Sequence, residues 1–247
     1  MGVFAVACGD DNDTKPSSDG AAISGEVVVF AASSLTEAFT AIGEAFTEEY
    51  PDAHVTFNFA GSGDLVTQIT QGAPADVFAS ADDSNMTKLI DAGENNGDPI
   101  VIAKNTFQII VEPGNPKGIA DLADLADPDL IVVLCADTVP CGKGASTILA
   151  NAGVTVTAKS FEDKVKGVVT KVTAGEADAG IVFVTDVIAA GDAAEGVEIP
   201  SGLNVISNYP MVVTKGAPNA AAAQAFVDFV ARAQGQAILA LFGFLAR

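Results

Sequence analysis

Apolar residues along the chain recur at two spacings, one typical of β-strands and the other of α-helices. Residues 27–32 form an apolar run of the kind found in strands that are buried on both faces. Beyond Ser33 and Ser34 the apolar positions take helical spacing, at Leu35, Ala38, Phe39, Ile42 and Phe46. The pattern therefore predicts a strand that leads through two hydroxyl side chains into a helix.

The start of this helix has two interpretations. Ser34 and Glu37 have the spacing of a capping box, in which the two side chains bind free backbone N–H groups at the helix start. The first N–H groups of a helix also lie at the positive end of its dipole, so they can hold an oxyanion without a lysine or arginine. This stretch is therefore either a plain helix cap or part of an anion site.

A second stretch repeats the arrangement. Residues 55–60 alternate as a strand does, and Gly61, Ser62 and Gly63 connect them to another helical pattern. Glycines on both sides of Ser62 allow the backbone to approach a ligand closely. The alternative is a glycine-rich turn with a helix cap.

Strand and helix signals continue to alternate along the chain. Further short apolar runs, each followed by helical spacing, lie at 75–81, 130–134 and 179–184. This alternation predicts an α/β fold whose mostly parallel sheets are joined by right-handed crossovers, with ligands beyond the carboxyl ends of the strands.

Two lobes are expected. Two apolar runs within 99–111 are separated by Lys104, Asn105 and Thr106, and we place a crossing between the lobes there. The predicted first lobe comprises residues 25–105 and 209–247, and the predicted second lobe comprises residues 106–208.

Charge narrows the choice of partners. The chain has 247 residues with 32 Asp+Glu and 12 Lys+Arg, a formal net charge of −20, so it has no broad basic surface for nucleic acid or anionic membranes. An acidic protein that binds an anion has to use local neutral donors and helix ends.

The N-terminal segment 1–24 indicates a location. Ala5, Val6, Ala7 and Cys8 resemble the end of a bacterial lipoprotein signal, with Cys8 as the lipidated residue and residues 9–24 as a flexible tether. A full signal would need a basic region and a longer apolar region, so the segment looks truncated. The prediction is a protein outside the cytoplasmic membrane that touches the membrane only through a lipid anchor; the alternative is an ordinary tail with a chance cysteine.

The residues offer little for catalysis or for a metal cation. His54 is the single histidine and lies in an alternating strand, and Gly61-Ser62-Gly63 lacks the Gly-x-Ser-x-Gly spacing of a nucleophile elbow. Cys135 and Cys141 have no partners at zinc-ligand spacing. We therefore expect no enzyme activity, no cofactor and no metal cation.

With Cys8 consumed by lipid, Cys135 and Cys141 form an even pair in an oxidising compartment. They are predicted to form a disulfide that braces the loop between them. Two buried free thiols are the alternative.

Several motifs together resemble those of the extracytoplasmic molybdate-binding protein of bacterial ABC importers. The resemblance covers residues 26–247 and is carried by Val29-Phe30-Ala31-Ala32-Ser33-Ser34-Leu35-Thr36, Phe59-Ala60-Gly61-Ser62-Gly63, Gly72-Ala73-Pro74-Ala75-Asp76-Val77-Phe78, Gly180-Ile181-Val182-Phe183 and Tyr209-Pro210. It implies a periplasmic-binding-protein-like fold of type 2, with an oxyanion in the cleft between two lobes, each a mostly parallel sheet flanked by helices.

The resemblance also implies a ligand, its donors and a partner. Hydroxyl and N–H groups of Ser34 and Ser62 would bind molybdate or tungstate from the first lobe, and the N–H groups of Cys141 and Val165 from the second. The expected partner is the membrane permease of an ABC importer, with the protein itself a monomer.

One departure from the family concerns Phe183. Better-known members have a tyrosine after Gly-Ile-Val whose hydroxyl contacts the anion, and a hydrogen bond to a charged group contributes roughly 1.5–3 kcal/mol. Phe183 is either a cleft residue that lacks this donor or a core residue at a strand end. The alternative is therefore a binding protein of the same fold whose ligand is another small anion, such as sulfate, phosphate or an organic anion.

Overall fold

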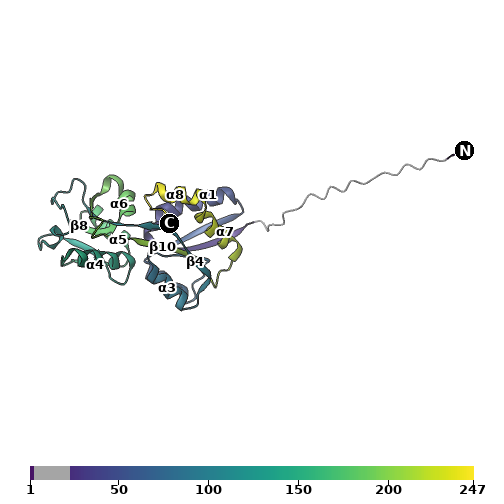
Figure 1. Ribbon diagram of the computed structural model, residues 1–247, viewed down its shortest axis with the longest axis horizontal. Coiled ribbons are helices and arrows are strands. Elements are labelled where there is room, and N and C mark those ends of the chain that lie inside the picture. The colour runs from purple at the N-terminus through teal and green to yellow at the C-terminus, as the bar shows by residue number, and fades with distance from the viewer. Residues whose placement is uncertain (3–22) are drawn as a thin grey trace.

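Two five-stranded sheets, each covered by helices, form the centres of two lobes in the computed structural model, which describes residues 1–2 and 23–247 (Figure 1). The first sheet has the order β2-β1-β3-β10-β4 and consists of β1 (Gly25–Ala32), β2 (Ala53–Ala60), β3 (Val77–Ala79), β4 (Asn95–Asn105) and β10 (Ser207–Thr214). Its helices are α1 (Thr36–Glu49), α2 (Ser62–Thr70), α3 (Asp83–Asp91), α7 (Ala220–Ala231) and α8 (Ala233–Leu241).

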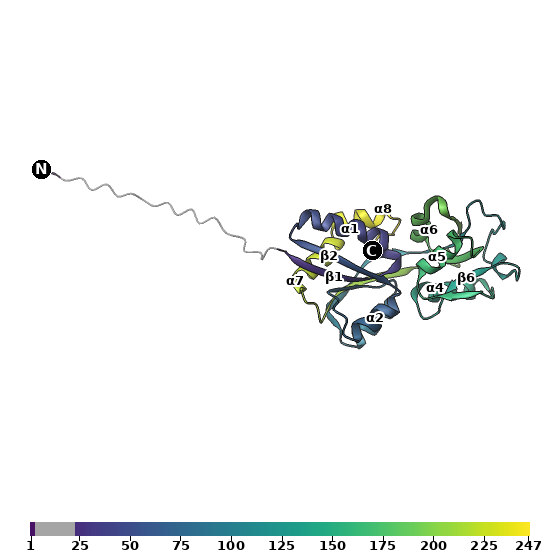
Figure 2. The same ribbon diagram turned by 180° about the vertical axis from the view of Figure 1, so that it is seen from behind.

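The second lobe lies beside the first, as both views show (Figures 1 and 2). Its sheet has the order β7-β6-β8-β5-β9 and consists of β5 (Phe107–Val111), β6 (Val132–Cys135), β7 (Ser160–Glu162), β8 (Ala179–Phe183) and β9 (Glu195–Glu198). Its helices are α4 (Pro140–Ala152), α5 (Val165–Thr173) and α6 (Val184–Ala190), and single 3₁₀ turns occur at Ser33–Leu35, Asp124–Ala126 and Gly191–Ala193. No helix in the described part combines the length and apolar character needed to cross a bilayer.

The burial of β1 explains its unbroken apolar sequence. Successive side chains of a strand point to opposite faces of the sheet. Val27 and Val29 join the core under α1 and α7, whereas Phe30 joins a separate core under α2 and α3. The strand therefore needs apolar residues on both faces, as the sequence pattern predicts.

Each sheet is mostly parallel, as the sequence predicts, and contains one reversed strand among its five. β10 pairs antiparallel with both β3 and β4, and β5 pairs antiparallel with both β8 and β9. The other pairings, β1 with β2 and β3 and β6 with β7 and β8, are parallel. Both sheets are therefore mixed, with half of their described pairings antiparallel.

The reversed strands are the first ones after each crossing between the lobes. β4 ends at Asn105 and β5 begins at Phe107, so the chain crosses at Thr106, as predicted. Because β4 arrives at the junction, β5 has to run away from it. The return crossing lies before Ser207, which already pairs with Asn105, so the second-lobe segment ends slightly earlier than the predicted residue 208.

Two ion pairs join the lobes across their junction. Lys143 Nζ of α4 lies 2.8 Å from Asp82 Oδ2 of the first lobe and also contacts the hydroxyl of Ser84. Lys166 Nζ of α5 lies 2.8 Å from Glu37 Oε1 of α1. Two separate ion pairs thus connect the lobes.

Lys166 has a second carboxylate neighbour, Asp186, which is completely buried. The ammonium lies 3.1 Å from Asp186 Oδ1, within ion-pair distance, although neither carboxylate oxygen has a partner with hydrogen-bond geometry in the described structure. Burial raises the pKa of Asp186 to about 6, and the charge of Lys166 opposes this rise. Burial lowers the pKa of Lys166, but the charges of Asp186 and Glu37 outweigh it, so the pKa is raised and the ammonium stays charged.

The buried Asp186 predicts a pH dependence of stability. A carboxyl whose pKa is higher in the folded than in the unfolded chain stabilises the fold below pH ~4, and this contribution is lost as the pH rises through about 6. In Asp186→Asn, the free energy of unfolding relative to the wild type should therefore rise between pH 4 and 6.5, by an amount on the order of 3 kcal/mol. Urea unfolding at several pH values measures this, with the exposed Asp98→Asn as the matched control. A difference that stays flat across the window would contradict the prediction.

A close backbone contact between the lobes involves Gly61. A Cβ built on Gly61 would overlap the backbone carbonyl oxygen of Asp163 in the second lobe, whereas one on Gly63 would meet nothing nearer than 3.7 Å. Gly61 has φ −62°, a value open to any residue, so only this contact requires glycine there.

Gly61→Ala should therefore hold the lobes further apart without unfolding either one. Small-angle X-ray scattering is expected to show a larger radius of gyration for Gly61→Ala and no change for Gly63→Ala. Equal radii for the two variants would show that the lobes accommodate the added methyl group.

Candidate anion-binding site

A small cavity lies at the junction of the two lobes. The first lobe contributes Ala32, Ser33, Ser34, Ala60, Gly61, Ser62 and Ala81, and the second lobe contributes Val139, Pro140, Cys141, Lys164, Val165 and Phe183. The parallel strands of both lobes end here, because β1, β2 and β8 each run directly into lining residues. The cavity thus occupies the place where ligands are expected in open α/β sheets.

All the ligand-binding residues proposed from the sequence line this cavity. Ser34 lies in the 3₁₀ turn before α1, Ser62 is the first residue of α2, Cys141 is the second residue of α4, and Val165 is the first residue of α5. The starts of four helices therefore converge on one space, two from each lobe. The positive ends of their dipoles make it favourable for an anion.

These helix starts share a second property. No side chain within the described residues caps α1, α2, α4 or α5. Elsewhere, α3 is capped by Asp82 and α7 by Asn219, while α6 and α8 have no side-chain cap. The N–H groups that face the cavity are thus left without side-chain acceptors.

The capping box predicted at Ser34 and Glu37 is wrong. Glu37 instead pairs with Lys166 across the junction, and the hydroxyl of Thr36 donates to the carbonyl of Ser33. Ser34 Oγ lies 2.9 Å from the hydroxyl of Tyr209. Neither predicted capping partner is bound to the helix start, because both have partners far away in sequence.

The hydroxyl of Ser62 has a proton that it can donate into the cavity. The backbone N–H of Ala81 donates to Ser62 Oγ over 3.1 Å, and Ser62 is almost completely buried. Because the oxygen already accepts this bond, its own proton remains for a group in the cavity. Ser62 therefore presents a hydroxyl donor next to the backbone N–H groups of α2.

Asp82, which caps α3, is held in its charged form by its hydrogen-bond partners. Although burial raises the pKa of Asp82, hydrogen bonds from the Lys143 ammonium and the Asn85 N–H outweigh burial and hold the pKa below its usual value. The carboxylate thus stays charged and paired beside the cavity rather than facing it.

The structure contains the predicted disulfide between Cys135 and Cys141. Cys135 ends β6 and Cys141 lies in the first turn of α4, so the bridge ties the start of α4 to the sheet. Both residues are buried. The bridge restricts the loop that carries the Cys141 N–H to the cavity, which reduces the entropy that a ligand would have to remove.

Phe183 combines the two roles that the sequence left open. It lines the cavity, and its ring also packs against Phe107 at 4.5 Å and against Tyr209 at 5.8 Å between ring centres. The phenylalanine therefore supplies an apolar wall and no donor.

The lining is poor in reactive groups. Lys164 is the one lining residue with an ionisable side chain, and Cys141 is in the disulfide. In the described part of the chain, no group of three or more histidine, cysteine or acidic side chains is arranged to hold a metal ion. What the cavity offers is hydroxyl and N–H donors, which suit a small anion that only accepts hydrogen bonds.

One polar residue that contacts the site from behind the cavity lining was not assigned a role from the sequence. Tyr209 follows the return crossing in β10, and its hydroxyl binds Ser34 although the two residues are 175 positions apart. Burial raises the pKa of Tyr209, so the phenol stays protonated. The Tyr209-Pro210 pair is visible in the sequence as a motif, but no local pattern connects it to Ser34.

Known proteins are similar to this chain in sequence and in fold. The molybdate-binding protein ModA of Mycobacterium tuberculosis is 41% identical over 239 residues, which cover 97% of this chain and 92% of that protein. Among solved structures, the periplasmic molybdate-binding protein of Azotobacter vinelandii has a TM-score of 0.78 at 21% identity and covers 90% of this chain and 99% of its own. The sulfate-binding protein SubI of M. tuberculosis has a TM-score of 0.80 at 20% identity, with coverage of 89% and 86%.

The two structures share the two-lobed fold seen here, and the ModA relative matches almost the whole sequence. The profile of the family described as bacterial extracellular solute-binding proteins matches residues 27–245. The chain therefore belongs to the bacterial extracellular solute-binding protein family.

Proposed function

We propose that this chain captures molybdate or tungstate outside the cytoplasmic membrane and delivers it to the permease of an ABC importer. The dianion would occupy the cavity between the lobes. Ser34 and Ser62 would donate from the first lobe, and the backbone N–H groups of Cys141 and Val165 from the second. The anion is cargo, and the proposal involves neither chemistry nor a cofactor.

The convergence of uncapped helix starts carries this proposal. Four of them, two from each lobe, face the cavity, and an anion supplies the acceptors that side chains supply at α3 and α7. A hydrogen bond to a charged group contributes roughly 1.5–3 kcal/mol, so several such donors are enough for tight binding.

The net charge of −20 makes this local arrangement necessary. The overall field of the protein repels an approaching anion, but at physiological ionic strength it is screened over about 8 Å. Binding then depends on the short-range donors in the cavity, which salt screens less.

Capture and release of the anion would depend on the contacts between the two lobes. Because both lobes supply donors, the anion binds fully only when the lobes are together, and the pairs Lys143–Asp82 and Lys166–Glu37 support that arrangement. Partly exposed ion pairs contribute only about 0–1 kcal/mol each, so a permease that pulls the lobes apart meets a low barrier from them.

The similarity to ModA supports molybdate in particular, since the match extends over 97% of this chain. Molybdate and tungstate are tetrahedral dianions of nearly the same size, and the cavity donors do not distinguish them. The alternative ligand is another small anion such as sulfate, phosphate or an organic anion. Phe183 favours this alternative, because it lacks a hydroxyl donor that is expected for molybdate.

A lipid on Cys8 would keep the protein at the membrane surface close to its permease. Cys8 lies outside the described residues, and the proposal rests on the Ala-Val-Ala-Cys sequence alone. We propose that the protein acts as a monomer, since the two lobes of one chain complete the cavity.

Anion titration tests the proposed function directly. Molybdate and tungstate should raise the melting temperature of the purified protein by mass action, and sulfate and phosphate at equal concentration far less. Differential scanning fluorimetry of the apo-protein measures these shifts. Shifts with sulfate or phosphate as large as those with molybdate would contradict the assignment and favour the alternative ligand.

Phe183→Tyr is expected to tighten molybdate binding by about tenfold or more, because it returns a hydroxyl donor to the cavity wall. Isothermal titration calorimetry measures the affinity. Phe107→Tyr is the matched control, since Phe107 belongs to the same aromatic cluster but does not line the cavity. A loss of stability without any gain in affinity in Phe183→Tyr would show that the position serves the core.

A further inference from the structure

A series of buried, hydrogen-bonded side chains runs from the crossings between the lobes to the cavity. Asn105 Nδ2 lies 3.4 Å from the hydroxyl oxygen of Tyr209, which lies 2.9 Å from Ser34 Oγ. The same Nδ2 donates to Thr185 Oγ1 of the second lobe over 2.8 Å. All four residues are buried, with 0–4% of each exposed.

The amide of Asn105 decides which group donates and which accepts in each of these hydrogen bonds. Asn105 Oδ1 accepts the backbone N–H of Thr106 over 3.0 Å, so it is the Nδ2 side that faces Tyr209 and Thr185. An amide nitrogen only donates, and Tyr209 therefore accepts from Asn105. Among the described residues, the remaining hydrogen-bond neighbour of the Tyr209 hydroxyl is Ser34, so the phenol proton goes to Ser34 Oγ.

This order of donors and acceptors leaves the Ser34 hydroxyl with one orientation. Its oxygen already accepts from Tyr209, and the structure gives its proton no other acceptor in the described residues. Ser34 lines the cavity, so the proton is available to a group there. A serine without this support could rotate and present a lone pair to an anion, which would repel it.

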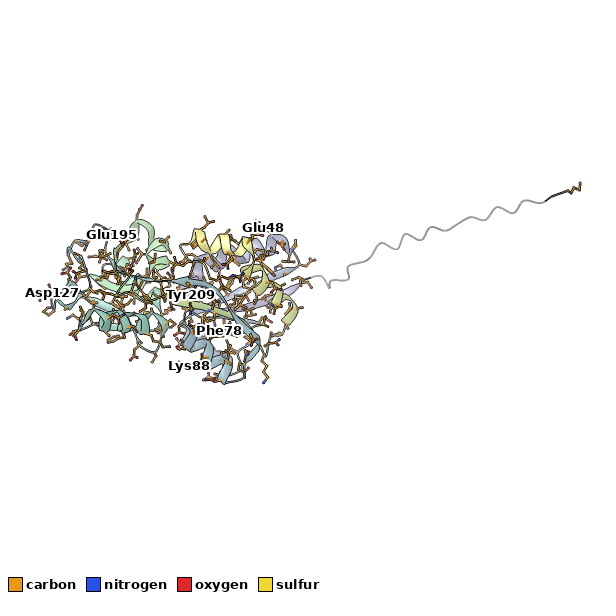
Figure 3. All side chains as sticks on the ribbon, viewed as in Figure 1. Glu48, Phe78, Lys88, Asp127, Glu195 and Tyr209 are labelled. Atoms are coloured by element: carbon orange, nitrogen blue, oxygen red, sulfur yellow. A yellow bond between two sulfur atoms is a disulfide. The ribbon has the colours of Figure 1, made fainter. Side chains whose placement is uncertain are left out.

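We infer that Asn105 and Tyr209 are positioning residues that make Ser34 an obligatory hydrogen-bond donor to the anion. The inference rests on the proposed function. Asn105 is the last residue before the first crossing, and Tyr209 follows the return crossing, close to the junction in Figure 3. The donor geometry of the site is thus set by the two segments that join the lobes, although neither side chain lines the cavity.

A double-mutant cycle with molybdate tests this inference. Tyr209→Phe should weaken binding about tenfold and Ser34→Ala at least tenfold, as expected for a hydrogen bond to an ion. The double variant should bind no more weakly than Ser34→Ala, because Tyr209 acts through that hydroxyl. Tyr50→Phe is the matched control, since it removes the hydroxyl of the other tyrosine, and it should bind like the wild type.

Two results of the cycle would overturn the inference. One is wild-type affinity in Tyr209→Phe. The other is a further loss of the same size when Tyr209→Phe is added to Ser34→Ala, which would indicate a general structural role. A wild-type protein that does not bind molybdate contradicts the proposed function instead, and the cycle is then repeated with the anion that raises the melting temperature.

A second measurement covers the case in which Tyr209→Phe does not fold. In a Tyr50→Phe chain labelled with 3-fluorotyrosine, Tyr209 is the single labelled position. Saturation with molybdate should shift its ¹⁹F resonance, and Ser34→Ala should greatly reduce that shift. A resonance that does not move on saturation, or a shift that Ser34→Ala leaves unchanged, would show that the phenol is not coupled to the bound anion.

Discussion

The free N–H groups at four helix starts are the constraint on which the other features of this molecule depend. Helices α1, α2, α4 and α5 begin at one cavity, and none of them has a side-chain cap in the described structure. Leaving buried N–H groups without an acceptor costs about 1–3 kcal/mol each, so the cavity requires a partner that accepts from several directions at once. A small oxyanion meets this need, which explains how a protein with a net charge of −20 can bind one.

The same constraint gives a role to the crossings between the lobes. The strands that end at the junction bring the helix starts there, and the chain has to pass the junction twice to build both lobes. The residues beside these crossings, Asn105 and Tyr209, are buried and bound to each other. The ion pairs of Lys143 with Asp82 and of Lys166 with Glu37 also connect the lobes, and none of these four residues lines the cavity.

Much of this arrangement could be predicted from local sequence. Strong apolar periodicity located the strands and helices, and Lys104-Asn105-Thr106 located the first crossing, because both signals lie within a few residues. Ser34 and Ser62 could be proposed because each follows a strand directly, and the structure brings both to the cavity. Cys141 and Val165 required the family resemblance, since neither side chain carries a sign of its backbone role.

The features that the sequence did not reveal have a common physical origin in long-range contacts. Glu37 fits a capping box by spacing, but it pairs with Lys166, which is 129 residues away, and no side chain caps α1. Which single strand of each mostly parallel sheet is reversed, β10 or β5, follows from where the chain enters that sheet, and strand composition does not record direction. The partnership of Tyr209 with Ser34 likewise depends on the folded junction alone.

The claim that an oxyanion completes these helix starts is tested most directly by anomalous X-ray diffraction from a crystal of the protein grown with molybdate. We expect one strong molybdenum peak between Ser34, Ser62, Cys141 and Val165, with the oxygens of the anion within hydrogen-bond distance of their N–H and hydroxyl groups. A molybdenum peak elsewhere, or a cavity without one in protein saturated with molybdate, would contradict it.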